Sequence, residues 1–305
     1  MKQLIVLLAV AISLKVTAQK QVVITIDDLI SNGPFRDLAH IQQVNRQVLD
    51  TALKYDVPVI GFVNEGKLFR EGEEQDRKQI LKDWLEAGMD LGNHTYSHPS
   101  LYNTPLDDYK EEVLKGGIYT SSVLEDAGSK MRYFRHPYLN TGPDSTTRAS
   151  FEAFLAAEGY TIAPVTVESS DYVFNKLYAN AVLEGDTAEM KVVGETYVSH
   201  TLRMFDWMEA VADTVVGRAI PHTYLCHVNP LNANYLGAIY QGLIDKGYEF
   251  ITLEKALEDE AYSKTDYHIG QWGVSWLYRW DKGNVQKWLM TEPAIDPEIL
   301  RKYQE

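Results

Sequence analysis

The chain has 305 residues, of which 45% are hydrophobic and 24% charged. This composition excludes a disordered chain and is sufficient for one large α/β domain or two small ones. The formal net charge of -14 disfavours phosphate backbones and anionic membrane surfaces, so we expect no nucleic acid and no membrane among the partners of the mature protein. The single cysteine, Cys226, excludes a disulfide within the chain.

The first 18 residues have the pattern of a secretory signal. They begin with Met1-Lys2, continue with a short apolar run and end in Val16-Thr17-Ala18. The run is too short to span a bilayer. The residue directly after the expected cleavage site is Gln19 and not a cysteine, which disfavours a lipid-anchored lipoprotein. We therefore expect a signal peptide over residues 1–18 and an exported protein, periplasmic or extracellular. A buried N-terminal strand or an anchor is the alternative interpretation.

Apolar runs of strand length alternate with segments of helical periodicity from residue 21 to residue 253. We expect strands at 21–27, 57–63, 89–91, 132–135, 160–167, 223–228 and 248–253. Helices are expected at 40–54, 76–87, 104–126, 145–157, most of 173–220, and 233–246. About seven strand-helix units in succession predict an α/β fold with a parallel sheet, either open or closed as a barrel.

Ionisable side chains lie at or just beyond the C-terminal ends of the predicted strands. They are Asp27-Asp28, His94, Arg135, Asp171 and His227. In parallel α/β architectures the loops beyond these strand ends converge on one face, where the chemistry takes place. Scattered core or surface residues have no reason to follow this rule, so the pattern predicts one functional site.

His94 and His98 are four residues apart and directly follow a short apolar strand. Imidazole nitrogen and carboxylate oxygen together suit zinc or a neighbouring first-row divalent ion. Pro99 disfavours a helical conformation at His98, so we expect the two rings to converge from one turn. Zinc proteases carry a glutamate after the first histidine, but Thr95 stands there. A base must therefore come from elsewhere, unless the two histidines are only a local pair on a polar loop.

Asp27 and Asp28 close an apolar strand, where two charges cost desolvation energy unless they have partners. Adjacent side chains on a strand point in different directions, so one carboxylate can bind a metal while the other accepts a proton from water. Asp107-Asp108 is the same dipeptide, but it lies in the first turn of a predicted helix, where the helix dipole explains it. We interpret Asp27-Asp28 as functional.

Two further segments have both a structural and a functional interpretation. Residues 135–138 can be a simple turn, or Arg135 pairs with a carboxylate while the turn aims the Tyr138 backbone N–H at a developing oxyanion. His227, taken alone, is typical of a core histidine. Beside Asp171, which can raise its pKa, His227 becomes a candidate general acid.

One motif is set aside. Residues 61–67 match the spacing of a phosphate-binding loop that ends in Lys67, but Leu68 stands where a serine or threonine must bind magnesium. No Gly-x-Ser-x-Gly elbow is present for a serine hydrolase, and Cys226 lies within a predicted strand. Nucleotide binding and nucleophilic serine or cysteine chemistry are therefore not expected.

The motifs resemble those of the polysaccharide deacetylases, carbohydrate esterase family 4, which share the chitooligosaccharide-deacetylase homology domain. The resemblance rests on five segments in the family order: Thr25-Ile26-Asp27-Asp28, His94-Thr95-Tyr96-Ser97-His98-Pro99, Arg135-His136-Pro137-Tyr138, Asp171-Tyr172 and Leu225-Cys226-His227. Tyr172 stands where the family commonly has tryptophan. The resemblance covers about residues 20–255 and implies a distorted (β/α) barrel of about seven parallel strands.

The resemblance also implies roles for these residues. Asp28, His94 and His98 would hold a divalent ion, most readily Zn2+, with Co2+, Ni2+ and Mn2+ as alternatives. Asp27 would be the base and His227 the acid, with Arg135 and Asp171 tuning this pair. The implied activity is removal of N-acetyl groups from N-acetylglucosamine-containing glycans of the peptidoglycan or chitin type. An O-acetyl esterase on xylan and a non-catalytic carbohydrate-binding protein are the alternatives, and no oligomeric state is implied.

Beyond the expected catalytic domain, residues 19–255, the tail 256–305 is rich in aromatic residues. Four of them are Trp272, Trp276, Trp280 and Trp288. They could stack on sugar rings, but we expect packing on the barrel, because large aromatic side chains supply most of the buried area of a docking segment.

Overall fold

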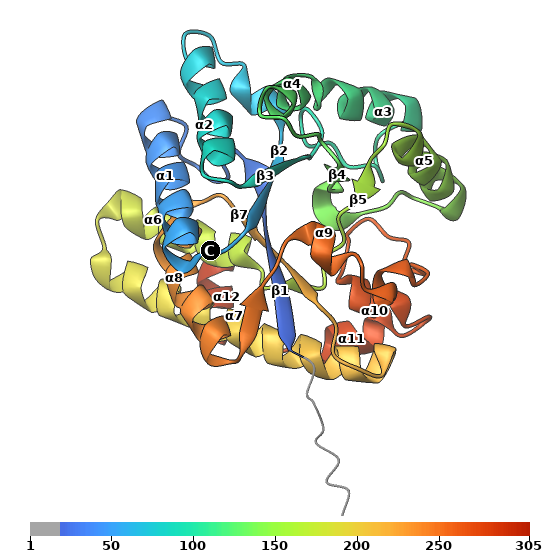
Figure 1. Cartoon of the computed structure of the whole chain (residues 1–305). Coiled ribbons are helices and arrows are strands. Elements are labelled where there is room, and N and C mark those ends of the chain that lie inside the picture. Colours follow the sequence, from blue (N-terminus) through green and yellow to red (C-terminus); the bar gives the residue numbers. More distant parts are fainter. Residues whose placement is uncertain (1–18) are drawn as a thin grey trace, which may run out of the picture.

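The computed structural model describes residues 19–305, and the signal peptide expected over 1–18 lies outside the described residues. A single parallel sheet runs through the molecule, with helices around it (Figure 1). Seven strands follow one another in the order β5-β4-β3-β2-β1-β7-β6, and β8 pairs with β1. The strands are β1 (Lys20–Leu29), β2 (Val59–Val63), β3 (Asp90–Asn93), β4 (Tyr133–Phe134), β5 (Thr161–Ile162), β6 (Val167–Glu168), β7 (His222–His227) and β8 (Tyr248–Phe250).

The helices are α1 (Leu38–Tyr55), α2 (Glu74–Glu86), α3 (Leu106–Lys115), α4 (Ile118–Asp126), α5 (Ser145–Ala157), α6 (Asp171–Glu184), α7 (Thr187–Val216), α8 (Pro230–Asp245), α9 (Leu253–Ala256), α10 (Trp276–Trp280), α11 (Val285–Thr291) and α12 (Pro297–Gln304). The described residues also form three short 3-10 helices: η1 (Glu65–Leu68), η2 (Pro137–Leu139) and η3 (Glu260–Ser263). In the part of the chain that the structure describes, no helix has the length and apolar character needed to cross a membrane.

The sheet curls because its two edge strands are consecutive in the chain. β5 and β6 lie at opposite edges of the sheet, yet only residues 163–166 connect them. So short a link brings the edges close together. The predicted distorted barrel of about seven parallel strands is confirmed. The single strand predicted at 160–167 is wrong, since this segment leaves one edge and joins the other.

β1 is the central strand, and residues 22–29 are all buried. Val22 pairs with His222 of β7 and Phe250 of β8, while Ile24 pairs with Tyr224 of β7 and with β2. β2 and β8 therefore share one edge of β1, and β7 takes the other. Because β1 is enclosed on both edges and both faces, its apolar side chains form the centre of the core, and its polar end is fixed in place.

The helix predicted over 104–126 is two helices, α3 and α4, which are separated at Gly116-Gly117. A Cβ atom at Gly116 would overlap the backbone of Thr95 and Tyr96. The Tyr96 backbone N–H also donates to the Glu112 carbonyl at 3.0 Å. The interruption lets the loop after β3 pass close to the helix, and that loop carries the two candidate metal-binding histidines.

The C-terminal tail crosses the link between the two edge strands. The Trp276 backbone N–H donates to the Val165 carbonyl at 2.7 Å, and the Ser275 hydroxyl donates to the Thr166 carbonyl at 2.8 Å. Trp276, Trp280 and Trp288 are buried in the main core cluster. Trp272 differs from them because 64% of its surface is exposed.

Candidate active site

Five strands bring the predicted site residues together at the C-terminal end of the sheet. Asp27 and Asp28 lie near the end of β1, and His94 follows β3 directly. Arg135 follows β4, Asp171 begins α6 just after β6, and His227 ends β7. Polar residues at strand ends thus meet as the parallel arrangement requires.

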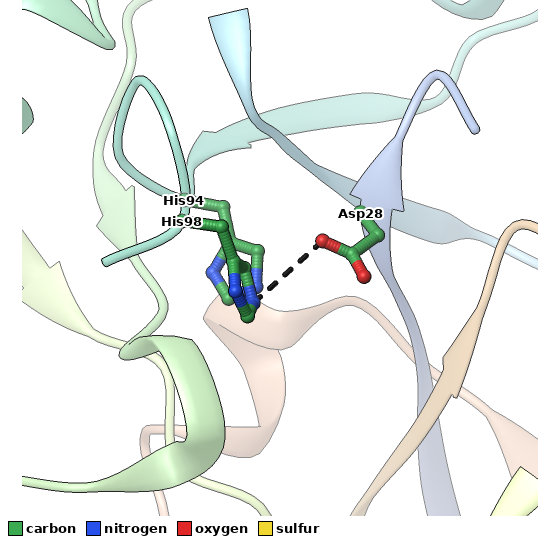
Figure 2. Close-up of side chains that lie close together, drawn as sticks. All are labelled: Asp28, His94 and His98. Carbon is green, nitrogen blue, oxygen red and sulfur yellow. Dashed lines mark ion pairs between the residues drawn. The ribbon is translucent and has the colours of Figure 1, made fainter. Parts of the chain in front are cut away.

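Asp28, His94 and His98 form a cluster with metal-ligating chemistry (Figure 2). One ligand atom from each residue lies within 4.8 Å of the others. The His94 Nδ1 lies 2.8 Å from the Arg135 carbonyl oxygen, so Nδ1 carries the proton and Nε2 is left as an acceptor. Burial lowers the pKa of both histidines. Both rings are therefore neutral, as metal binding requires.

Asp28 supplies the negative charge of this cluster. Burial opposes its ionisation, but the Lys67 ammonium beside it holds the pKa of Asp28 well below its usual range. Asp28 accepts hydrogen bonds from Asn32 at 2.6 Å and Lys67 at 3.1 Å, and it lies 3.7 Å from the His98 Nε2. One carboxylate and two neutral imidazoles fit a first-row divalent ion, and zinc in particular.

The sequence reasoning did not assign Lys67 to this site. Its Nζ donates to the Asp28 carbonyl at 2.9 Å as well as to the Asp28 carboxylate. The residue belongs to the segment that resembles a phosphate-binding loop, and it lies four residues beyond the end of β2. Its position just beyond the C-terminal end of a parallel strand is the signal that could have identified Lys67, because the same rule identified the other candidates.

Asp27 is buried beside the cluster. Its Oδ2 lies 3.8 Å from both the His94 Nε2 and the Arg135 Nη1. Burial raises the pKa of Asp27 to about 6, although the Arg135 and His227 charges favour ionisation. Within residues 19–305 the buried Oδ1 accepts no hydrogen bond. Asp27 is thus a carboxylate that is more basic than an ordinary aspartate and has one oxygen without a hydrogen bond, which suits proton transfer.

Arg135 connects Asp27 to the histidine loop. Its side chain is fully buried, donates to the Thr25 hydroxyl at 2.9 Å and stacks on the Phe62 ring at 4.7 Å. Its carbonyl oxygen accepts from His94. Through both groups Arg135 fixes the orientation of Asp27 and His94.

His227 and Asp171 form a tight pair. The His227 Nδ1 lies 2.7 Å from the Asp171 Oδ1, and the His227 backbone N–H donates to Oδ2 at 2.9 Å. Burial disfavours the imidazolium, but Asp171 raises the pKa of His227 to about 10. Asn229 and Asn232, which the sequence reasoning did not single out, donate to the same carboxylate at 3.1 and 2.7 Å. His227 is therefore held protonated, as a general acid must be.

Left-handed backbone conformations are concentrated at the site. Of the described non-glycine residues with positive φ, only Asp56, the C-cap of α1, lies elsewhere. The others lie near the ends of strands or in the loops that follow them: Asp28, Thr95, His98, Tyr138, Leu139 and Ser170. Backbone strain of this kind is typical of functional sites. At Tyr138, where φ is 55°, it turns the loop so that the ring packs 4.6 Å from the His98 ring.

The fold and the site define a distorted (β/α)-barrel protein with a candidate Asp-His-His metal centre. Residues 15–154 match the family model described as polysaccharide deacetylase. The resemblance to this family that the motifs predicted is confirmed over this part of the chain.

Two curated relatives are similar over part of their length. A chitooligosaccharide deacetylase of Sinorhizobium fredii is 27% identical over 118 residues, which are 39% of this chain and 51% of the relative. A peptidoglycan-N-acetylglucosamine deacetylase of Bacillus cereus is 26% identical over 165 residues, 53% of this chain and 52% of the relative. The chain thus spans about half the length of these relatives.

Solved structures share the fold. A carbohydrate esterase family 4 pseudoenzyme of Bacillus anthracis has a TM-score of 0.54 at 16% identity, covering 80% of this chain and 66% of its own. A polysaccharide deacetylase of Bacillus cereus has a TM-score of 0.51 at 18% identity, covering 77% of this chain and 92% of its own. At such identities the likeness concerns the fold alone.

Proposed function

We propose that this protein is a metal-dependent hydrolase that removes N-acetyl groups from N-acetylglucosamine-containing glycans of the peptidoglycan or chitin type. One observation carries the proposal. A base of raised pKa, Asp27, and a protonated acid, His227, are register partners on adjacent strands beside the candidate metal cluster. Amide hydrolysis needs both groups, one to activate water and one to protonate the leaving amine.

The proposed cofactor is a divalent ion held by Asp28, His94 and His98. The donor set suits Zn2+ first, with Co2+, Ni2+ and Mn2+ as alternatives. When bound, such an ion acts as a Lewis acid toward the acetyl carbonyl and the attacking water. The ionised Asp28 and the two neutral rings are ready for binding without losing protons.

The protein's own groups divide the proton transfers. Asp27, ionised at neutral pH, accepts a proton from the water whose oxygen bonds to the acetyl carbon. The Tyr138 backbone N–H is proposed to donate to the carbonyl oxygen as negative charge develops there. His227 then gives its Nε2 proton to the amine nitrogen as the carbon-nitrogen bond breaks, while Asp171 stabilises its protonated form until then. The products are acetate and a glycan with a free amine.

The glycan substrate is supported by the similarity to the family and by the activities for which the two relatives are named. Export to the periplasm or beyond is proposed from the pattern of residues 1–18, and it agrees with a cell-wall or chitin-type substrate. N-terminal sequencing of the secreted protein tests it, with Gln19 expected as the first residue.

The test of the activity is a comparison of substrates. Zinc-loaded protein is incubated with chitin oligomers, peptidoglycan fragments and acetylated xylan, and released acetate and product masses are measured. Loss of N-acetyl groups from the first two supports the proposal. Release from xylan alone would make the protein an O-acetyl esterase. Glycan binding without acetate release from any substrate would make it a carbohydrate-binding protein.

A further inference from the structure

The C-terminal tail, residues 256–305, which we call the extension, places one exposed tryptophan next to the candidate active site. The other three tryptophans of the extension are 6 to 7% exposed, whereas Trp272 is 64% exposed. The Trp272 ring lies edge-on to Tyr138, with 5.8 Å between centroids, and the Tyr138 ring lies 4.6 Å from His98. These aromatic rings form a row that leads outward from a candidate metal ligand.

The backbone fixes Trp272 against the Tyr138 loop. The Gly273 N–H donates to the Tyr138 carbonyl at 2.9 Å. A Cβ atom at residue 273 would overlap the Leu139 carbonyl, so only glycine permits this approach. Trp272 is therefore held beside Tyr138 by the chain itself.

A buried arginine reinforces the same junction. Arg279 donates to the Leu139 carbonyl and to the Val274 carbonyl, the latter at 2.8 Å. It is itself held by Asp266 at 3.1 Å and stacks on the Trp276 ring at 3.7 Å. A buried cation committed to two loop carbonyls makes the junction rigid, so the exposed Trp272 ring occupies a defined position rather than a free loop tip.

A large exposed aromatic ring beside a polar reaction centre is available to contact a ligand, unlike the three buried tryptophans of the extension. Aromatic faces suit the apolar C–H face of a pyranose ring, and Tyr138, which is 45% exposed, extends the same surface toward His98. The protein's strong negative charge favours a neutral ligand at this surface over an anionic one.

We propose that Trp272 and the Tyr138 ring form an aromatic wall that binds a sugar unit next to the unit being deacetylated. The inference rests on the proposed function and narrows its substrate class to chains of at least two sugars. Trp272 positions the glycan and takes no part in the reaction itself, because two ring contacts separate it from His98 and it lies outside the metal cluster. Removing its ring should therefore affect glycans long enough to reach it and spare shorter substrates.

The experiment compares Trp272→Ala, Trp272→Phe and the wild type, all zinc-loaded. Met290→Ala is the control, because Met290 is a 77% exposed apolar residue of the same extension on α11. Acetate release is measured on 4-nitrophenyl acetate, on a chitin hexamer and on solubilised peptidoglycan chains. Binding of the better glycan is measured by calorimetry in the Asp27→Asn background, where turnover is blocked.

For Trp272→Ala we expect KM for the better glycan to rise about tenfold with a much smaller change in kcat, and calorimetric affinity to fall by about the same factor. The preference for that glycan over the aryl ester should fall correspondingly. Trp272→Phe should recover most of the loss, and Met290→Ala should match the wild type.

Three results would overturn the inference. Unchanged KM and affinity in Trp272→Ala would show that the ring does not touch the glycan. Equal losses on the ester and the glycan would show that Trp272 acts only by packing Tyr138. Ester hydrolysis by the wild type without activity or binding on either glycan would overturn the proposed function, and the aromatic wall with it.

Discussion

Asp27 and His227 are register partners on the neighbouring parallel strands β1 and β7, and their environments move their pKa values in ways that suit opposite roles. Burial raises the pKa of Asp27 to about 6, and Asp171 raises that of His227, against the effect of burial, to about 10. Around neutral pH the first group is ionised and the second protonated. The sheet register thus sets the proposed base and the proposed acid side by side.

Replacing Asp171 by Asn should move the alkaline limit of activity. Asp171 raises the folded-state pKa of His227, so the imidazolium persists until pH rises through about 10. Its contribution to folding stability is complete below the unfolded pKa of about 6.5 and is lost as pH rises through about 10. Without the carboxylate, the alkaline limb of the pH profile of kcat/KM should shift down toward 6.5. The profile measured between pH 5 and 11 checks this, and an unmoved alkaline limb would contradict the role of the pair.

Replacing His94 by Ala should abolish stabilisation by zinc. A ligand that binds only the folded protein at 100 times its Kd adds about 2.7 kcal/mol, which raises the Tm of the wild type. Removing one of three protein ligands should remove most of that rise. Thermal unfolding with and without zinc measures it, with His40→Ala as control, since His40 lies outside the cluster. A rise of wild-type size in His94→Ala would exclude this metal site.

Replacing Lys67 by Met should lower the stability of the metal-free protein and increase its response to zinc. The substitution leaves the buried Asp28 carboxylate without its ammonium partner, at a cost of roughly 1–3 kcal/mol. It also removes a cation that competes with the metal for the same oxygen. Lys110→Met is the matched control, because Lys110 forms a surface pair with Asp107 at 3.0 Å. A zinc-induced Tm rise no larger than that of the wild type would refute the competition.

Replacing Gly273 by Ala should loosen the extension from the site. The added methyl group overlaps the Leu139 carbonyl, so the backbone must shift, at a cost of about 1–3 kcal/mol. Gly237→Ala is the control, because nothing lies closer than 3.5 Å to a Cβ there and the residue is within α8. Chemical denaturation measures both. Equal stability of the two variants would mean that the junction at Leu139 is not rigid.

Periodicity, turn chemistry and strand-end position are local signals, and they were sufficient to predict a parallel α/β sheet and the candidate residues at its strand ends. The closure of the sheet into a distorted barrel was implied only by the resemblance to the family. It did not predict what depends on contacts across the fold. The segment 160–167 has the composition of one strand, but its two halves pair with β4 and β7 at opposite edges. The break between α3 and α4 falls at Gly116-Gly117, a pair that is a turn signal in sequence. The close approach of the Thr95 backbone to Gly116 is visible only in the fold.

The same limit applies to the site. The predicted candidates gather there, but the partners that tune them come from distant segments: Lys67 beside Asp28, and Asn229 and Asn232 on the carboxylate of Asp171. Each is an ordinary polar residue in sequence. Its significance follows only from the folded position of its side chain.

The central claim is that Asp27 is the base and is separate from the metal ligands. The most direct measurement combines metal content and acetate release for Asp27→Asn on a chitin oligomer. We predict a zinc content equal to that of the wild type, with kcat lowered by about 100-fold or more. Acetate release near the wild-type rate, or loss of the zinc together with the activity, would contradict the account.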